Sequence, residues 1–546
     1  MKKNEIIELN IEDTTFEGSG VGRLENGMAV FVPGCAAGDR IRAKIVKAKK
    51  TYAFAIVDDY ISLSSDRQEN DCDIYKKCGG CCFRHITYEA ELKVKENTVF
   101  ENLKKEGIQA EISKIIPSPN ITGYRNKAQL PIRNDADGNI SIGFYAKRSH
   151  RVVNLSHCHL HPEFFDDIVE YTRRFVEKYN ISAYNEVNNS GLLRHLYIRY
   201  GEESGEIMVC LVINGRKLPN SDVFAAGLIN LNKNIKSIML NVNTEKTNVI
   251  LGRKNILLYG TPYINDILCG NKYHISPTSF YQVNRSGAEK LYNLAAEMAG
   301  LSGNETVLDL YCGVGTIGLS VANKVKKVIG VEIVPDAVED AKRNAQINNI
   351  QNAEFICSDA AAAADALLKR GERPDIVIVD PPRKGCSNEL LETISKLSPE
   401  KIIMISCNSA TMARDIRLIE QAGYKLGKVQ PIDMFPCTAH VETVCLLTRE
   451  KSVKSYAYVN ISPSELGMGG EIKKPTYENI KQYVEKTHGL TVSSLNIAQM
   501  KTECGLEKQA DRFGDKKQPN CPPEKREAIL DAFRHFGMIE DESEED

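Results

Sequence analysis

Three changes of sequence pattern predict a multidomain fold of the β and α/β classes with helices at the carboxyl end. Residues 1–62 alternate short polar and apolar runs between glycines, which is typical of a small OB-like β-barrel. Residues 123–213 carry longer alternating runs, which predict a mostly antiparallel α+β segment. From residue 305 apolar strands alternate with helices, the pattern of a Rossmann-like, doubly wound sheet, and short helices follow residue 450.

Length and composition set the frame for this prediction. The chain has 546 residues, and because single cores rarely exceed ~250–300 residues, we expect about three or four domains. We place them at residues 1–62, 63–283, 284–450 and 451–546. There is no long apolar segment and no apolar signal core, so we expect a cytoplasmic protein without membrane contact, and a monomer. A net charge of −2 means that nucleic-acid binding requires local basic patches.

The amino-terminal barrel has turns at residues 18–22, 25–27 and 33–34. Between Arg40 and Lys50 there are six Lys or Arg residues and no acid, which predicts either a basic edge or an ordinary solvated strand face. Through the segments FEGSGVGR and FVPGCAAGD and the basic strand after them, this region resembles the TRAM domain, an RNA-binding barrel.

A cysteine-rich segment follows the barrel. Cys72, Cys78 and Cys81 have the spacing C-x5-C-x2-C, with an additional Cys82, and two glycines between the sulfurs allow the backbone to fold around one metal or cluster. Cys158, in LSHCHLHP, supplies a candidate fourth ligand. Sixteen cysteines spread through a cytosolic chain favour metal binding or catalysis over disulfides, and a Zn²⁺ site is the competing interpretation.

Basic and aromatic side chains recur along the predicted strands of the central segment. Such a mixture suits single-stranded RNA, whose bases stack and whose phosphates pair with cations, although a solvated sheet face has a similar pattern. The residues are Arg125, Lys127, Arg133, Lys147, Arg148, Arg151, Arg194 and Arg199, with Tyr124, Tyr145 and Tyr197.

The strand–turn–helix segment VLDLYCGVGTIGLSVA predicts a nucleoside site. Gly313 and Gly315 allow a ligand close to the backbone, and Glu332 ends the next strand, where it can accept hydrogen bonds from ribose hydroxyls. The third glycine of a dinucleotide turn is missing, so S-adenosylmethionine fits better. Asp359 ends the third strand and can reach an adenine amino group, or is an ordinary turn aspartate.

The fourth and fifth strands carry candidate reacting groups. Asp380 ends the run DIVIVD before two prolines, and Cys407 follows the short apolar strand KIIMIS. The later segment MFPCTAHVE supplies His440 and Glu442 at the start of another strand. A thiol and a carboxylate at strand ends favour covalent chemistry on carbon over the NPPY-type site of adenine N-methyltransferases, which needs no thiol.

Residues 1 to about 450 resemble the RNA uracil-5-methyltransferase family, most closely its 23S rRNA (uracil-5-)-methyltransferase branch. The likeness rests on CGGC with its outlying cysteine, FYQVN, LDLYCGVGT, DPPRKG, and SCNSATMARD followed by HVE. The resemblance implies a [4Fe–4S] cluster, S-adenosylmethionine and an RNA partner. By matching position it implies cluster ligands Cys72, Cys78, Cys81 and Cys158, cofactor-site residues Gln282, Tyr311, Glu332 and Asp380, nucleophile Cys407 and base Glu442.

Two positions depart from the family pattern: Arg84 stands where Gln is more frequent, and Ser409 where Pro is usual. We expect the second change to loosen the turn beside Cys407 without removing a reacting group. The alternatives are a methyltransferase for uridine in the tRNA T-loop and a non-catalytic RNA-binding iron–sulfur protein. A DNA cytosine methyltransferase would have a Pro-Cys pair at the nucleophile.

The resemblance ends near residue 450. Residues 477–487 predict a helix, Gly489 a turn, and Ser493 or Ser494 the cap of a second helix, in a helix-turn-helix-like pattern. A helical hairpin used only for packing has the same pattern. PPEKREAILDAFRHF predicts a third helix beginning at Pro, and EDESEED a disordered acidic tail. We assign this extension no function.

Overall fold

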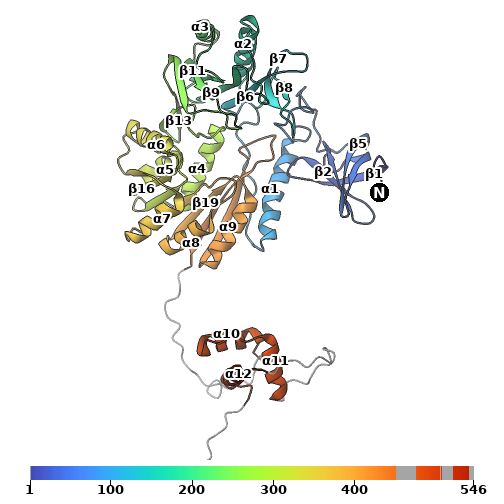
Figure 1. Cartoon of the computed structure of the whole chain (residues 1–546), viewed down its shortest axis with the longest axis vertical. Coiled ribbons are helices and arrows are strands. Elements are labelled where there is room, and N and C mark those ends of the chain that lie inside the picture. The colour runs from blue at the N-terminus through green and yellow to red at the C-terminus, as the bar shows by residue number, and fades with distance from the viewer. Residues whose placement is uncertain (1, 451–474, 505, 507–520, 540–546) are drawn as a thin grey trace, which may run out of the picture. The chain divides into compact units, whose positions relative to one another are not determined.

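The computed structural model describes residues 2–450, 475–504, 506 and 521–539 (Figure 1). The described residues form two compact units, one on each side of residue 452. The first unit contains a closed β-barrel, a central mixed sheet and a doubly wound sheet, and the second contains helices. This confirms the predicted fold class.

The amino-terminal barrel closes in the strand order β1-β2-β3-β5-β4, with β4 paired to β1. Its strands are β1 (Ile6–Thr14), β2 (Ser19–Arg23), β3 (Ala29–Pro33), β4 (Arg40–Ala48) and β5 (Tyr52–Ser62). The turn before β2 needs glycine, because Gly18 has φ +78° and a Cβ there would lie 2.3 Å from the Cys82 carbonyl oxygen. The barrel therefore packs closely on the cysteine-rich segment.

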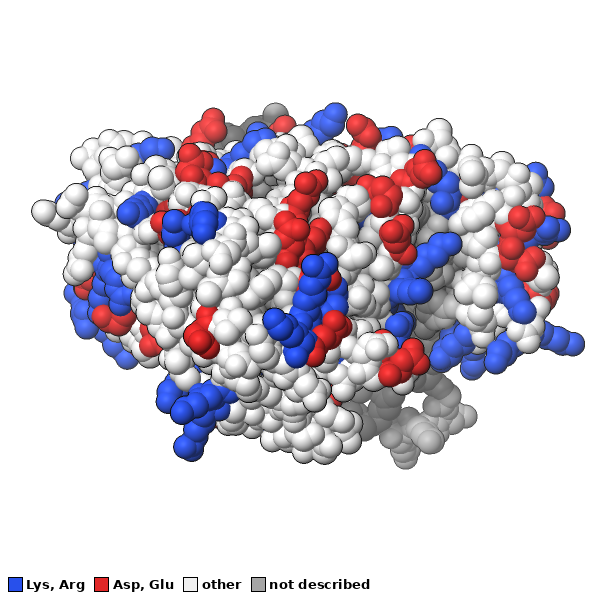
Figure 2. All heavy atoms as spheres, turned by 90° about the horizontal axis from the view of Figure 1, so that it is seen from above, with Lys and Arg blue, Asp and Glu red and all other residues white. Residues whose placement is uncertain are grey.

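The basic strand β4 is partly neutralised within the barrel. Arg40 pairs with Glu8 at 2.9 Å and Arg42 with Asp59 at 2.7 Å. Figure 2 likewise shows acidic and basic side chains interspersed over the face in view, without one continuous basic surface.

The central sheet has the order β12-β11-β10-β9-β6-β7-β8, and all of its pairs are antiparallel except β10 with β11. Its strands are β6 (Lys127–Asn134), β7 (Ile140–Tyr145), β8 (Val152–Asn154), β9 (Leu193–Tyr200), β10 (Ile207–Ile213), β11 (Ile235–Val242) and β12 (Lys254–Gly260). Helices α2 (Phe164–Lys178) and α3 (Ser221–Leu231) pack on this sheet, and the hairpin β13 (Ile264–Leu268) and β14 (Asn271–Ile275) follows it.

Part of the basic and aromatic set on this sheet is internal, where the sequence pattern suggested side chains available to RNA or solvent. Arg194 and Arg199 are buried, as are Tyr124 and Tyr197. Arg194 instead bonds the carbonyls of residues 243, 245 and 247 and lies over the Tyr184 ring. Three cations of the predicted set are exposed, namely Lys147, Arg148 and Arg151. Three more, Arg125, Lys127 and Arg133, are half-buried.

The third sheet has the order β17-β16-β15-β18-β19-β21-β20. Its strands are β15 (Thr306–Leu310), β16 (Lys327–Glu332), β17 (Ala353–Cys357), β18 (Ile376–Val379), β19 (Lys401–Ser406), β20 (Tyr424–Ile432) and β21 (Glu442–Arg449). The first five are parallel, and β21 runs antiparallel to both β19 and β20. The carboxyl ends of the parallel strands thus meet the amino end of β21 at one edge.

Both faces of this sheet are covered, as its uninterrupted apolar strands require. One apolar cluster joins it to α4 (Arg285–Ala299), α5 (Thr316–Val321), the short helix η1 (Ala322–Lys324) and α6 (Pro335–Ile347). The other joins it to α1 (Tyr88–Lys105), α7 (Ala360–Lys369), α8 (Asn388–Leu397) and α9 (Ser409–Gln421). Helix α1 belongs to this layer, beside α9 (Figure 1), although our division by sequence places it in the central segment.

The second unit contains α10 (Tyr477–His488), α11 (Ser494–Glu503) and α12 (Pro523–His535) around a shared apolar cluster. Thr476 and Ser493 each form a capping box, and Gly489 ends α10 with φ +67°. The predicted acidic tail lies outside the described residues. Within the described ranges, no helix is long and apolar enough to cross a bilayer.

Candidate active site

Cys407 and Glu442 come from neighbouring antiparallel strands. Ser406, the last residue of β19, pairs with Thr443 of β21, so Cys407 and Glu442 lie next to each other just beyond this pair. Both line one cavity of about 810 Å³ at the carboxyl edge of the parallel strands. Cys407 is half-buried, and Glu442 is 5% exposed.

Burial and like charge dominate the electrostatics at this end of the cavity. Burial raises the pKa of the Cys407 thiol, and the nearby carboxyl groups of Glu442 and Asp380 raise it further. Burial, with a contribution from Asp380, raises the pKa of Glu442 to about 8. Asp380 lines the cavity and is half-buried, and burial raises its pKa to about 7. All three groups are therefore easily protonated near neutral pH.

The turn after Asp380 is held by the start of helix α9. The Arg383 carbonyl oxygen accepts hydrogen bonds from Asn408 Nδ2 at 3.0 Å and from Thr411 Oγ1 at 3.3 Å. Asn408 also caps α9, and the Ser409 hydroxyl accepts a hydrogen bond from Asn102 of α1 at 2.8 Å. This contact restrains the turn beside Cys407, where we expected Ser409 to loosen it.

His440 lies opposite this turn. Arg383 Nη2 is 2.9 Å from His440 Nε2, and burial together with this guanidinium lowers the pKa of His440 to about 4. The imidazole is therefore neutral at physiological pH. The Arg383–His440 contact escaped the sequence analysis, although Arg383 stands in the DPPRKG motif.

The opposite part of the cavity has the features of a nucleoside site. Gly313 lines it with φ +55°, and a Cβ there would meet no atom, so glycine serves the backbone conformation. Glu332 accepts from the N–H groups of Gly313 at 3.1 Å, Ile333 at 2.9 Å and Val334 at 3.0 Å. These bonds fix the carboxylate at the end of β16.

Asp359 also lines the cavity and at the same time caps α7, accepting from Ala361 N at 2.9 Å and Ala362 N at 3.3 Å. Tyr311 and Gln282 complete the predicted lining. Gly315 does not line the cavity. It begins α5 with φ +83°, and a Cβ there would lie 3.1 Å from the Phe355 ring.

Two further lining residues carried no prediction of cofactor or catalytic role. Phe280 is 61% exposed at this cavity, where its ring is free to stack on a base. Arg125, predicted only as part of the basic sheet, lines this cavity and also the cysteine-lined cavity described below.

A groove of about 570 Å³ continues from Cys407 toward the barrel. It shares Arg383, Cys407 and His440 with the first cavity, and its outer wall consists of residues 13–16 of the barrel and the side of α1 from Asn97 to Lys105. Phe16 is 53% exposed at this wall. An extended chain can follow the groove from the surface to Cys407.

The four predicted ligand cysteines line a separate cavity of about 270 Å³. They are Cys72, Cys78, Cys81 and Cys158. Arg84, Arg125 and Lys127 line the same cavity, so cations surround the thiols. Within the described residues, no three His, Cys, Asp or Glu side chains are close enough to hold a single metal ion.

Cys82 and Arg84 have other partners. Cys82 does not line the cysteine cavity and packs on the small apolar cluster of Phe83, Ile86 and Ala90. Arg84 is buried, and its guanidinium bonds Asp71 through Nε at 2.8 Å and lies 3.7 Å from Cys437 Sγ. Arg84, which stands where Gln is more frequent in the family, thus has a carboxylate partner.

A doubly wound sheet with a nucleoside-type cavity at the carboxyl ends of its strands is the architecture of α/β enzymes that bind nucleotides or nucleosides. Residues 87–450 match the family model described as tRNA (Uracil-5-)-methyltransferase, and residues 2–57 match the TRAM domain. An uncharacterized RNA methyltransferase of Halalkalibacterium halodurans is 42% identical over 452 residues, 82% of this chain and 98% of that protein. One of Bacillus cereus is 43% identical over 451 residues, with the same coverage.

Among solved structures, the chain is similar to the Pyrococcus abyssi tRNA (uracil-54, C5)-methyltransferase in complex with S-adenosyl-L-homocysteine. The TM-score is 0.65 and the identity 29%, covering 81% of this chain and 100% of that chain. The chain therefore belongs to the tRNA (uracil-5-)-methyltransferase family and carries a TRAM domain. It is an S-adenosylmethionine-dependent RNA (uracil-5-)-methyltransferase.

Proposed function

We propose that this enzyme methylates carbon 5 of a uridine in 23S rRNA, with Cys407 as nucleophile and Glu442 as base. The observation that carries the proposal is the position of these two side chains, side by side at the strand ends and lining one cavity with Glu332 and Asp359. Bound S-adenosylmethionine supplies the methyl group as an electrophilic substituent of its sulfonium.

Cys407 opens the reaction because carbon 5 of uracil is a poor nucleophile. The thiolate Sγ forms a bond to carbon 6, the carbon 5–carbon 6 π electrons move toward the carbonyl oxygen at position 4, and the resulting enolate makes carbon 5 nucleophilic. Since burial raises the thiol pKa, Cys407 needs a nearby proton acceptor. Neutral His440 and the carboxylates of Glu442 and Asp380 are the candidates in this cavity.

Glu442 closes the reaction. Once carbon 5 carries the methyl group, the Glu442 carboxylate removes the remaining proton from carbon 5. The electron pair of that C–H bond re-forms the double bond, the carbon 6–Sγ bond breaks, and the thiolate is regenerated. A base with a pKa of about 8 matches this proton transfer near neutral pH better than an unperturbed carboxylate does.

Asp380 and Gln282 are the residues that we assign to the polar edge of the uracil ring. Both line the same cavity as Cys407. With a pKa of about 7, Asp380 can donate as a carboxylic acid or accept as a carboxylate, which matches the N3–H and carbonyl edge of uracil.

The remaining lining residues fit S-adenosylmethionine. Glu332 accepts hydrogen bonds from ribose hydroxyls, Asp359 from the adenine amino group, and Gly313 allows the ligand near the backbone. Tyr311 lines the same region, and its φ of +66° is uncommon for a residue with a side chain, as expected where the backbone is shaped around a ligand.

We further propose that Cys72, Cys78, Cys81 and Cys158 hold a [4Fe–4S] cluster that orders the segment between the barrel and the central sheet. A Zn²⁺ ion needs its ligand sulfurs at about 2.3 Å from one point, and the described residues bring no such group together. A cavity of about 270 Å³ surrounded by four thiols and lined by Arg84, Arg125 and Lys127 suits a larger, anionic cluster.

The choice of 23S rRNA rests on the combination of the TRAM barrel with the cysteine segment. The similarity to an archaeal tRNA (uracil-54, C5)-methyltransferase over its whole length favours tRNA as the second candidate substrate. In either case the target base must leave its stack to reach Cys407, which is easiest for a looped or unpaired nucleotide. Arg125, Arg383 and Lys384 line the cavity as cations for the RNA backbone.

The roles of Cys407 and Glu442 are tested by trapping. Cys407→Ala abolishes methylation of a uridine-containing RNA while leaving S-adenosylmethionine binding intact. Glu442→Gln accumulates a covalent RNA adduct that resists denaturing electrophoresis, because release of the enzyme requires the base. Methylation by Cys407→Ala at nearly the wild-type rate contradicts the mechanism.

The substrate is tested separately by mapping 5-methyluridine in rRNA and tRNA from a strain that lacks the gene. Loss of one 23S rRNA modification, restored by the wild-type gene but not by Cys407→Ala, supports the first candidate. Loss of 5-methyluridine from tRNA alone identifies tRNA, the second candidate, as the substrate.

A further inference from the structure

Residues 433–441 form the loop that connects β20 to β21 and therefore lead directly into Glu442. The loop carries Phe435 and His440 into the reaction cavity. Any movement of this loop moves the general base, so the contacts that hold it bear on the reaction.

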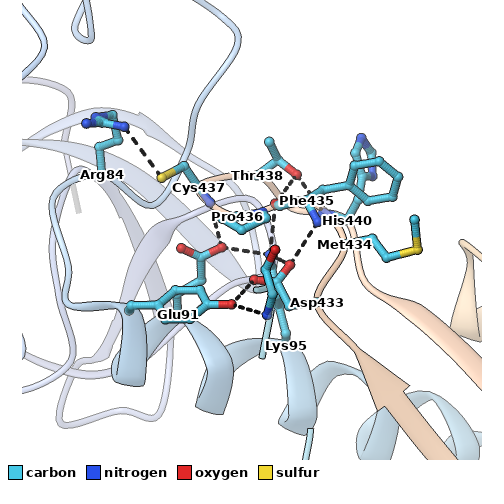
Figure 3. A network of polar contacts seen from close by, with 12 residues as sticks. Arg84, Glu91, Lys95, Asp433, Met434, Phe435, Pro436, Cys437, Thr438 and His440 are labelled. Carbon is cyan, nitrogen blue, oxygen red and sulfur yellow. Dashed lines mark hydrogen bonds and ion pairs between the residues drawn. The ribbon is translucent and has the colours of Figure 1, made fainter. Parts of the chain in front are cut away.

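Lys95 of α1 holds the beginning of the loop. Its Nζ donates to Asp433 Oδ1 at 2.7 Å and to the Phe435 carbonyl oxygen at 3.0 Å, and lies 2.7 Å from Glu91 Oε1 (Figure 3). These three acceptors use all three N–H groups of the ammonium. Lys95 and Asp433 are 2% and 0% exposed, so water contributes little to the network.

Glu91 holds the middle of the same loop. Its Oε1 accepts from the backbone N–H of Cys437 at 2.8 Å. Cys437 has φ +67°, a conformation that a non-glycine residue keeps only when its surroundings enforce it. On the other side, the Cys437 carbonyl oxygen accepts from Cys82 N at 2.8 Å and Phe83 N at 3.2 Å.

Two tyrosines complete the attachment. Tyr88 of α1 donates to Asp433 Oδ2 at 2.8 Å, and the buried Tyr124 donates to the Pro436 carbonyl oxygen at 2.9 Å. Loop residues 433 and 435 to 437 are thus bonded to α1, to the cysteine-rich segment or to the start of the central sheet. The Met434 carbonyl oxygen accepts from Asn284 Nδ2 at 2.9 Å, at the start of α4. Beyond them, Thr438 Oγ1 donates back to the Phe435 carbonyl oxygen, the one that Lys95 also binds.

We propose that Lys95 is a positioning residue for the methyltransferase reaction, and that through Asp433, Phe435 and Glu91 it sets the position of the loop that presents His440 and Glu442. This inference rests on the proposed roles of Cys407 and Glu442. Cys407 is anchored separately, by β19 and the cap of α9. Lys95 therefore acts mainly on the Glu442-dependent release of the adduct and less on the Cys407-dependent addition.

The charges of the network support a specific rather than a generic packing role. One ammonium faces two carboxylates, and Glu91 and Asp433 raise the pKa of Lys95 above its usual value although burial opposes this. A buried ion pair that loses one partner leaves an uncompensated charge. The network is therefore stable only in the arrangement that keeps all three charged groups together. An apolar contact of the same size would tolerate small displacements of the loop.

The test is Lys95→Met, which keeps the length of the side chain and removes the ammonium. Because a misplacement of about 1 Å can cost about 100-fold in rate, we expect kcat to fall by about that factor. The RNA adduct then accumulates as in Glu442→Gln, while the rate of adduct formation in a single turnover and the affinity for S-adenosylmethionine stay near wild type. Lys93→Met, an exposed lysine on the same helix, is the matched control and leaves all of these unchanged.

Asp433→Asn and the charge-balanced pair Lys95→Met with Glu91→Gln give the same readout if Lys95→Met alone does not fold. A folded variant that turns over like wild type, or that slows addition as much as release, overturns the inference. If Glu442→Gln accumulates no adduct, the proposed mechanism fails. If Glu442→Gln traps adduct and the folded Lys95 variants do not, only the role of Lys95 fails.

Discussion

Cys407 and Glu442 are brought together by strand direction. A residue just after β19 and a residue at the start of β21 become neighbours only because the two strands are antiparallel partners. The surrounding carboxyl groups then set their protonation. Burial and like charge raise the pKa of both groups. An activated thiol usually has a lowered pKa instead.

This electrostatic setting predicts the pH dependence of the reaction. In the proposed mechanism, addition needs the thiolate and release needs the Glu442 carboxylate, and an acid whose pKa is raised stays protonated up to that pKa. The turnover rate therefore falls as the pH drops below about 8 and rises between about pH 6 and about pH 9. Multiple-turnover methylation of RNA, measured across this range, checks the prediction.

Glu442→Gln separates the two contributions. Its adduct formation reports only on Cys407 and still rises with pH, because burial and Asp380 keep the thiol pKa raised. A methylation rate that is independent of pH over this range, with the protein folded throughout, contradicts the assignment of these two groups.

At the scale of the element, helix α7 shows that one side chain can serve a fold and a ligand. The two interpretations of Asp359, turn aspartate and adenine ligand, are compatible in the structure. The carboxylate caps the helix and also lines the cavity. Its contributions to stability and to binding are therefore separable by substitution.

Asp359→Ser and Asp359→Ala make that separation. Serine is a good N-cap, whereas alanine costs about 1 kcal/mol of stability at this position. Both variants lose the carboxylate, and we expect both to bind S-adenosylmethionine about tenfold more weakly. Calorimetric titration and thermal unfolding measure the two effects. If both variants bind S-adenosylmethionine with unchanged affinity, the only role of Asp359 is to cap α7.

The whole molecule decides how RNA reaches the thiol. The groove beside Cys407 has one wall from the methyltransferase sheet, one from α1 and one from the barrel, elements far apart in the sequence. The charged residues of the barrel are partly paired with each other, so we predict that the exposed Phe16 contributes to RNA binding in addition to the net charge of the barrel.

Phe16→Ala tests this route. Stacking of a base on an aromatic ring is worth about 1–3 kcal/mol, so we expect RNA affinity to fall at least fivefold to tenfold, as about 1.4 kcal/mol is tenfold. S-adenosylmethionine binding stays unchanged. Phe54→Ala, an exposed barrel aromatic outside the groove, is the control. Equal RNA affinities of the two variants would place the RNA elsewhere.

A chain that ends at residue 450 tests the second unit. The family match ends there, and the described residues that line the two cavities and the groove belong to the first unit. We expect the shortened enzyme to methylate a short target RNA at the wild-type rate. A large loss of activity in a folded, cofactor-binding truncation would show that the helices α10 to α12 take part in catalysis.

Periodicity in the sequence was enough to predict the class of each layer and the row of candidate site residues at the sheet edge. Gly313, Glu332, Asp359, Asp380 and Cys407 each follow an apolar strand, and parallel strand ends meet at one edge, so periodicity alone placed them together. Ligand roles for these residues, the cluster and the RNA target remain predictions.

The folded chain alone reveals the packing of α1 on the methyltransferase layer, the burial of Arg194 and Arg199, and the Lys95 network around residues 433–441. These features depend on contacts between residues far apart in the sequence, from 49 positions for Arg194 and Asn243 to 338 for Lys95 and Asp433. A periodic pattern reports which face of an element is apolar, but it does not report which distant element covers that face. For that reason Lys95 reads as an ordinary helix-surface lysine in the sequence and is a buried partner of Asp433 in the fold.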